Sequence, residues 1–528
     1  MSARHFAASE RYHDCPLAVR RGGTAALSTR APEGNPSGSD SELVVFSFID
    51  IPSLVVFNMS ESSPRVCQAF YRALLSRLPY AEKKRPWWCL PVQPFPVDVW
   101  IVLLLAYCKI DNTNQGIARR RRAICFAAPE INKLIHDRPL FWSWVYMDCN
   151  TYETDLARDL ALSGNSDLHV EANLRVESYS ESPFEYGQVL PGLLMERAGE
   201  TVGCLQRLLE ISRRWVSLII KINGPQLLVL AKDFLISARA PSLVVAVIES
   251  SYSGGPRVPE MLGRSLCSLT ALRVVSFPVV WLKSSPFGCL RHLDVKNISP
   301  SDHPSQTEFT DILRRLAPSL EHLSMGATGM RESPDYSPGC FQMDRLQRLE
   351  LVFLLVDPRQ TGFLVSVLGG LTAPCITHFR LVNCDSTSSS LIADGIPFVG
   401  GVTHLSVSRG AATLGSVSAL MRSMPWVVLA DFGTAPGAWA STLAAHPGCW
   451  PRLVSASCST DALTAFRTYA AGRALYGLPS MQSLICMYHP RLGVGDADSQ
   501  VLSDLRVLVN HVAESPLVYL IGEPNVEL

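Results

Sequence analysis

Three segments of the sequence repeat the same order of residues, and this repetition constrains the fold more than any other feature. Each segment has an apolar helical turn, then Ala-Pro, and then a short stretch in which apolar residues recur. The segments are 234–248 (FLISARAPSLVVAVI), 312–325 (ILRRLAPSLEHLSM) and 367–381 (VLGGLTAPCITHFRL), with looser copies at 418–432 and 478–487. Because proline stops a helix and pushes the preceding residue toward extended geometry, each copy predicts a helix followed by a short strand.

The expected strands recur at a regular spacing along the chain. An apolar anchor occupies the second position of each strand, and successive anchors lie 21 to 31 residues apart. The anchors are Leu218, Ala246, Leu272, Leu293, Leu323, Leu349, Phe379, Leu405, Ala430, Leu453 and Leu484. A unit of this size cannot bury its apolar face alone, so neighbouring copies must stack into a continuous core.

Several copies are similar to leucine-rich repeats, whose core reads Leu-x-x-Leu-x-Leu-x-x-Asn/Cys. The clearest copies are Leu290/Leu293/Val295, Leu346/Leu349/Leu351 and Ile376/Phe379/Leu381. Cys384 takes the Asn/Cys position after the last of these, and Cys458 takes it after Leu453. The resemblance implies an α/β solenoid, which is a curved leucine-rich-repeat domain with a parallel sheet on its concave side.

A small helical unit is predicted before the repeats. Pro96 suits the first turn of a helix, and Asp98 complements the positive end of that helix. A polar loop at 109–116 leads to a second helix carrying residues 119–126, which Pro129 breaks or restarts. The first helix has one apolar stripe, formed by Val99, Trp100, Leu103, Leu104 and Tyr107. Such a small core is marginal alone, so we expect the unit to dock on something else.

These residues resemble an F-box of the fungal, basidiomycete type. Phe95-Pro96-Val97-Asp98 fills the slot of the family's Leu-Pro-x-Glu, and Ala123–Trp142 aligns without a gap with the stretch that ends in Thr-Pro-x-Leu-Trp. The chain departs from the family at Phe95, at Ala127-Ala128-Pro129 and at Ile131, where the family has Trp. The resemblance implies that the unit binds a Skp-family adaptor and, through it, a cullin. The implied adaptor contacts are Pro96, Val99, Trp100, Leu103 and Leu104.

Composition divides the chain into five predicted segments. Residues 1–42 are rich in Ser, Gly, Pro, Ala and Arg and are expected to be a disordered tail, while 43–90 are mixed and partly helical. The F-box-like unit covers 91–150, the repeats cover 151–515, and 516–528 form a C-terminal tail.

Charge and motif content exclude several classes of protein. The 47 basic and 47 acidic side chains cancel, which argues against a nucleic-acid partner. The longest apolar run, Val99–Cys108, is about half a membrane span, so no membrane segment is expected. The 15 cysteines form no CxxC pair, and no P-loop, HExxH or GxSxG motif occurs. We therefore expect no cofactor, no metal and no enzymatic activity, in a protein of the cytoplasm or nucleus.

The densest basic run is Arg119–Arg122. It is compatible with a nuclear localisation or nucleic-acid contact, and equally with the solvated start of a helix.

Four histidines share one position in the repeats. His292, His322, His378 and His404 each directly precede an anchor, and Arg348 and Arg452 hold this position in two other repeats. Because residues that flank an inward anchor point outward, the six should form a column on the concave face, with Arg273 and Arg380 in the next column. One hypothesis is a site for an acidic or phosphorylated segment, strengthened as the histidines gain charge through a pH of roughly 6.5. The alternative is that these histidines are common filler in fungal repeats and pair with Asp294 or Glu350.

The two resemblances together imply a substrate-recognition subunit of an SCF-type ubiquitin ligase, whose repeats hold an unidentified protein substrate. The implied substrate-binding residues are His292, His322, Arg348, His378, Arg380 and His404. The alternative is a non-catalytic leucine-rich-repeat scaffold or sensor without ligase function.

Overall fold

The computed structural model describes a large part of the chain between residues 101 and 516. The described residues are 101, 104, 105, 108, 113–127, 129–175, 191–223, 225–251, 262, 266–283, 287–296, 303–326, 330–333, 339–353, 358–384, 386–408, 413–432, 437–488 and 496–516. The chain divides into two compact units, residues 1–145 with 158–166, and residues 146–157 with 167–528. The predicted segments 1–42, 43–90 and 516–528 fall almost wholly outside the described residues, and the five predicted domain bounds stay predictions.

The smaller unit is mainly helical where it is described, and it includes the first two residues of the strand at Trp144–Asp148. It contains α5 (Asn114–Ala127), α6 (Pro129–His136), the 3-10 helix η3 (Pro139–Trp142) and the end of α7 (Glu153–Leu162). Helix α5 begins earlier than predicted, inside the expected loop, because the Thr113 hydroxyl accepts a hydrogen bond of 3.0 Å from the Gly116 amide and caps the first turn. Pro129 is the first residue of α6, where its missing N–H is harmless, so it restarts the helix.

The larger unit is built on one parallel sheet. The sheet runs in sequence order from β1 (Trp144–Asp148) to β16, omitting β8 and β10, and every described strand pair from β2 onward is parallel. The other strands are β2 (Leu168–Leu174), β3 (Trp215–Ile222), β4 (Val245–Ser250), β5 (Ala271–Val275), β6 (His292–Lys296), β7 (His322–Gly326), β9 (Arg348–Val352), β11 (His378–Val382), β12 (His404–Ser408), β13 (Leu429–Asp431), β14 (Ser455–Ser459), β15 (Ser483–Tyr488) and β16 (His511–Pro516). A separate parallel pair joins β8 (Phe341–Gln342) to β10 (Leu371–Thr372).

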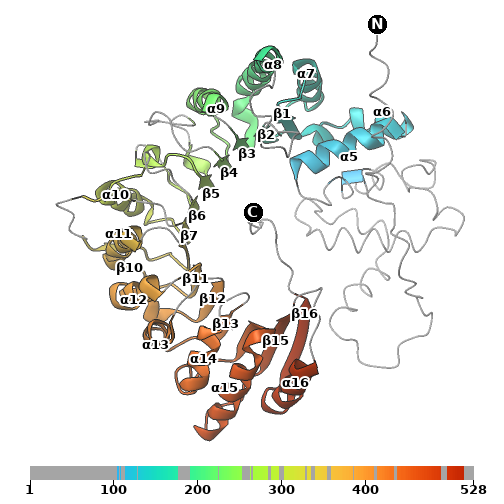
Figure 1. The fold of residues 1–528 in the computed structure, drawn as a ribbon. Helices are drawn as coiled ribbons and strands as arrows, with labels where there is room; N and C mark the ends of the chain where they lie inside the picture. Colours follow the sequence, from blue (N-terminus) through green and yellow to red (C-terminus); the bar gives the residue numbers. More distant parts are fainter. Residues whose placement is uncertain are drawn as a thin grey trace, which may run out of the picture. The chain divides into compact units, whose positions relative to one another are not determined.

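Helices cover the outer side of this sheet. Within the larger unit the strands line the inner side of an arc, and the helices follow its outer side (Figure 1). The α-helices are α8 (Pro191–Glu210), α9 (Pro225–Ser237), α10 (Gln306–Leu316), α11 (Pro358–Gly369), α12 (Ser386–Gly395), α13 (Leu414–Ser423), α14 (Ala438–Ala445), α15 (Leu463–Leu475) and α16 (Asp496–Leu508). Short 3-10 helices η4 (Ser212–Arg214), η5 (Leu266–Ser268), η6 (Val280–Lys283), η8 (Pro397–Gly401) and η9 (Thr460–Ala462) complete the connections.

Local sequence explains where the helices and strands begin. In the repeat at 312–325, α10 starts with a capping box between Ser305 and Glu308, ends at Leu316, and is followed by Pro318 and β7. The repeat at 367–381 differs, because the short strand β10 intervenes between the end of α11 and Ala373-Pro374. The predicted helix–Pro–strand order is therefore confirmed, with one additional strand.

Ten of the eleven predicted anchors lie in one register, and their side chains form a buried ladder between the sheet and the helices. The register joins Leu218, Ala246, Leu272, Leu293, Leu323, Leu349, Phe379, Leu405, Ala430 and Leu484 through neighbouring strands. This is the core of an α/β solenoid with leucine-rich-repeat character, as predicted.

The anchor at Leu453 is wrong, and Ala456 takes its place between Ala430 and Leu484. The Leu453 amide still donates a turn hydrogen bond of 3.1 Å to the Trp450 carbonyl, so the strand begins only at Ser455. Cys458 therefore lies inside β14, in register with Cys486, and does not take the Asn/Cys position. Cys384 does lie just beyond β11, two residues after Val382, and its buried Sγ lies 3.2 Å from the Ser389 Oγ in α12.

Candidate functional site

The predicted concave column is present on five neighbouring strands. The register joins His292, His322, Arg348, His378 and His404 on β6, β7, β9, β11 and β12. Because the next residue of each strand is a buried anchor, these five side chains project from the opposite, concave face of the sheet. Leu429 continues the column on β13. The role of these residues in binding stays a prediction.

The histidines of the column form two close pairs. The ring centroids of His292 and His322 are 5.7 Å apart, and those of His378 and His404 are 4.1 Å apart with an angle of 14° between the stacked rings. The Nδ1 atoms of His378 and His404 lie 2.8 Å and 2.9 Å from the hydroxyls of Thr377 and Thr403. Each stacked ring is therefore oriented by a hydroxyl from its own repeat.

Three of these imidazoles resist protonation. Burial, with help from His292 and Arg348, lowers the pKa of His322 to about 4. Burial also lowers the pKa of His378, with added repulsion from His404 and Arg348, and the pKa of His404, with added repulsion from Arg348. The predicted gain of charge near pH 6.5 is wrong for these three residues, because the folded chain favours their neutral form at neutral pH.

The next two columns carry a ladder of alternating charges instead of free cations, with Arg273, Asp294, Glu350 and Arg380 in the first and Glu249 and Lys296 in the second. Its ion pairs are Arg175–Glu249 (3.4 Å), Glu249–Arg273 (3.4 Å), Arg273–Asp294 (3.7 Å), Asp294–Lys296 (3.3 Å), Lys296–Glu350 (3.6 Å) and Glu350–Arg380 (3.7 Å). The five inner side chains of this ionic ladder are only 10–14% exposed. The Lys296 side chain on β6 crosses β7 to pair with Glu350 on β9. It can do so because β7 has only the small residues Ser324 and Gly326 at the positions that face this ladder.

The ionic ladder changes the roles predicted for two arginines and two acids. Arg273 lies in the predicted second column, but its charge is engaged by two carboxylates and largely buried, so it is not presented to a ligand. Arg380 is 40% exposed and pairs with Glu350. Asp294 and Glu350 pair with the cations of the ladder, which does not match the alternative in which they hold the column histidines.

Arg348 is the most exposed charge of the column. Among the described residues, no carboxylate forms an ion pair with its guanidinium, and Glu350, two residues later, is engaged by Lys296 and Arg380. Arg452 is not in the column, because Ser455 occupies its predicted place. It lies in the turn before β14, where its guanidinium stacks 4.3 Å from the ring centre of Trp426.

The column ends on an apolar side chain that was not predicted from the sequence. Leu429, next to His404 in the register, is 38% exposed, and Trp426, three residues earlier, is 46% exposed. The position of Leu429 in the column could have been predicted from the sequence, because Leu429 directly precedes the anchor Ala430. No sequence pattern indicated the stacking of Arg452 on Trp426.

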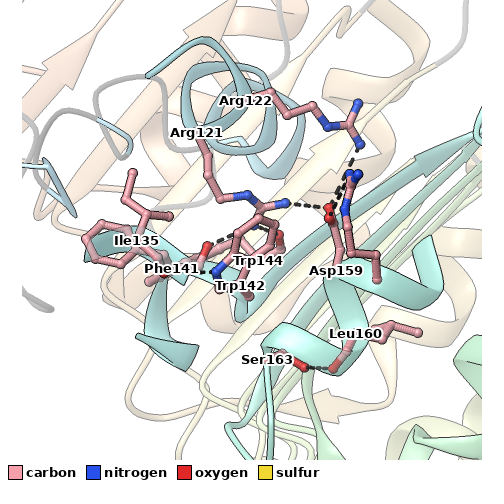
Figure 2. A network of polar contacts seen from close by, with 10 residues as sticks. Arg121, Arg122, Ile135, Phe141, Trp142, Trp144, Asp159, Leu160 and Ser163 are labelled. Atoms are coloured by element: carbon pink, nitrogen blue, oxygen red, sulfur yellow. Dashed lines mark hydrogen bonds and ion pairs between the residues drawn. The ribbon is translucent and has the colours of Figure 1, made fainter. Parts of the chain in front are cut away.

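The basic run in the smaller unit serves a buried network (Figure 2). Arg121, only 1% exposed, pairs with Asp159 at 2.7 Å and donates to the carbonyls of Phe141 (2.8 Å) and Trp144 (3.3 Å). Its guanidinium lies 4.2 Å from the ring centre of Trp142. Arg120 is buried as well, so the predictions of a nuclear localisation patch, a nucleic-acid contact or a wholly solvated helix start are wrong for the two central arginines.

The predicted adaptor contacts are only partly described. Pro96, Val99, Trp100 and Leu103 lie outside the described residues. Leu104 is 0% exposed, so it belongs to the apolar core of this chain and is not presented to a partner. Ile131, which stands where the family has Trp, is also buried and fills a core position in α6.

The described residues include no group of three or more His, Cys, Asp and Glu side chains arranged to hold a metal ion. Within the same part of the chain, no helix is long and apolar enough to span a bilayer.

Comparison with known proteins gives matches to solved structures alone. No protein family matches the sequence, and no curated protein matches it. The Rad7 and Elc1 complex of yeast aligns at 12% identity over 59% of this chain and 77% of that chain, with a TM-score of 0.29. The leucine-rich repeat-containing protein LegL7 of Legionella pneumophila aligns at 13% identity over 68% of this chain and 97% of that chain, with a TM-score of 0.33. The fold assignment therefore rests on the strand order and register of the chain itself.

Proposed function

We propose that the chain is the substrate-recognition subunit of an SCF-type ubiquitin ligase. The observation that carries the proposal is the order of two parts along one chain: an F-box-like segment, residues 95–142, and then a solenoid with a column of aligned His and Arg side chains on its concave face. In this role the protein catalyses no bond-making itself. It holds a protein substrate close to a ubiquitin-charged enzyme, and the reaction gains from proximity and orientation.

The two parts have separate tasks in this proposal. The helical unit docks on a Skp-family adaptor, and through it on a cullin, using Pro96, Val99, Trp100 and Leu103. The concave column holds the protein substrate. The complex would act in the cytoplasm or the nucleus.

Co-purification with a Skp-family adaptor tests the docking step. We expect the full chain to retain the adaptor, and the variant Trp100→Ala with Leu103→Ala to lose it. A matched control is Leu475→Ala with Val507→Ala, because both side chains are almost fully exposed on α15 and α16 of the larger unit. The control should bind the adaptor like the native chain.

Two results would count against the proposal. Equal adaptor binding by the Trp100/Leu103 variant and the control would contradict the model in which these side chains contact the adaptor. A native chain that folds but retains no adaptor would favour the alternative, a leucine-rich-repeat scaffold or sensor without ligase function.

A further inference from the structure

The concave column changes in character from one end to the other, and this change points to a peptide ligand with two recognised side chains. We propose that β9–β13 bind an extended peptide that carries an anionic side chain at Arg348 and an apolar side chain at Leu429, about four residues away. The inference rests on the proposed function only in taking the repeats as the protein-binding surface.

Arg348 provides the anionic point. Its guanidinium is exposed, and among the described residues no carboxylate pairs with it. The nearest acid on its strand, Glu350, is already flanked by Lys296 at 3.6 Å and Arg380 at 3.7 Å. An exposed guanidinium without a paired carboxylate binds oxyanions that accept two hydrogen bonds at once. Carboxylates and phosphoryl groups share this chemistry.

Leu429 provides the apolar point. It holds the column position directly after His404, and it is the column's exposed large apolar side chain within the described strands. Trp426, three residues earlier on the same segment, is 46% exposed and is held by the stacked Arg452. Covering such surface with an apolar ligand side chain is favourable by about 25 cal/mol for each Å² removed from water.

The register sets the distance between the two points. From Arg348 to Leu429 the column crosses three strand spacings, through His378 and His404. At about 4.8 Å for each spacing this is about 14 Å, and an extended peptide advances about 3.3 Å per residue, which gives about four residues. The imidazoles of His378 and His404 between the points stack face to face, with ring centroids 4.1 Å apart, and their lowered pKa values favour the neutral form. The intervening ligand residues therefore need no charge of their own.

Selection from a library of random dodecapeptides on the native full-length chain tests the spacing. We expect the selected peptides to pair an acidic residue with an apolar residue about four positions away, in either chain direction, more often than at other separations. A selected peptide is then remade in three forms. In the first the acidic residue is replaced by Gln, in the second it is replaced by phosphoserine, and in the third the apolar residue is moved by two positions. Loss of binding in the Gln and shifted peptides, with binding kept in the phosphoserine peptide, supports a general oxyanion site, and binding by the carboxylate peptide alone narrows the ligand to acidic side chains.

Matched protein variants test the two points on the chain. Arg348→Gln should weaken binding of the selected peptide at least about tenfold, because it removes charge-assisted hydrogen bonds, while Arg422→Gln on the outer helix α13 should leave it unchanged. Leu429→Ser should weaken binding about fivefold, and Leu475→Ser on α15 should not. A library without a preferred spacing, a library that yields no binder, or equal binding by Arg348→Gln and Arg422→Gln would overturn the inference. Each of these results leaves adaptor co-purification unaffected, so the two proposals fail separately.

Discussion

Replacing Arg121 should locally destabilise the smaller unit far more than replacing its neighbour Arg122. Arg121 is buried, and its partner Asp159 is 7% exposed at the side chain. Removing one partner of a buried ion pair usually costs about 3–5 kcal/mol, because the other charge stays buried without compensation. In this network Arg158 at 3.6 Å and Arg122 at 4.0 Å from the same carboxylate remain, which favours the lower end of that range. We therefore expect Arg121→Met to cost about 3 kcal/mol.

Two further variants separate the charge from the shape of the side chain. Arg122→Met removes an arginine that is 53% exposed and should change stability by less than about 0.5 kcal/mol. Arg121→Met combined with Asp159→Leu removes both charges, and it should recover at least about half of the single variant's loss.

Hydrogen exchange followed by peptide mass spectrometry is the appropriate assay, because a chain with two units does not unfold in a single two-state step. Amides of α5 should exchange faster in Arg121→Met, while amides of β9, β11 and β12 in the larger unit serve as an internal reference. If Arg121→Met and Arg122→Met accelerate exchange in α5 equally, the reasoning from the buried pair is refuted.

Two more predictions concern the repeats. The folded pKa of His322 is lowered to about 4 from the ordinary value of 6.5, so its neutral form contributes stability that is complete above pH 6.5 and is lost as pH falls toward 4. Hydrogen exchange of the β7 amides, corrected for the intrinsic pH dependence of exchange, should show that His322→Gln loses less local stability than the native chain between pH 6.5 and pH 4, and an equal loss would contradict the assignment. Gly472→Ala should destabilise α15 by about 1–3 kcal/mol despite the higher helix propensity of alanine, because the new Cβ would lie 2.5 Å from the Pro447 ring. Hydrogen exchange of the α15 amides checks this against Gly448→Ala, whose Cβ would meet no atom within 4 Å.

The sequence predicts those features that depend on neighbours along the chain. A helix that ends before Pro318 and a strand that places Leu323 inward follow from local rules, so repetition of the pattern was enough to align most anchors and to place the histidine column. The rule failed at Leu453 because this residue holds the first Leu position of the repeat, three residues before the anchor, as Leu320 does before Leu323. Ala456 follows Pro451 by five residues, the same spacing as in the other repeats, but its small side chain made it a weaker anchor candidate than Leu453.

The remaining features depend on groups that are distant in the sequence. A run of four arginines is usually solvated, and the burial of Arg121 follows only from Asp159, which lies 38 residues later in α7. The lowered pKa of His322 depends first on burial in the folded sheet and then on repulsion from His292 and Arg348, which come from other repeats. The ion pairs of Arg273 and Arg380 likewise join different strands, so their availability to a ligand could not be judged from one repeat.

The contact between Lys296 and Glu350 has a consequence for the cooperativity of the solenoid. A repeat array is usually treated as a one-dimensional chain in which each repeat interacts with its immediate neighbours. This ion pair adds a next-nearest-neighbour coupling, since it joins β6 to β9 across β7. The array gains a segment in which opening one strand loosens the strands on both sides. Partial unfolding should therefore spread through β6, β7 and β9 as one block, while the boundaries between partly open states fall elsewhere along the arc.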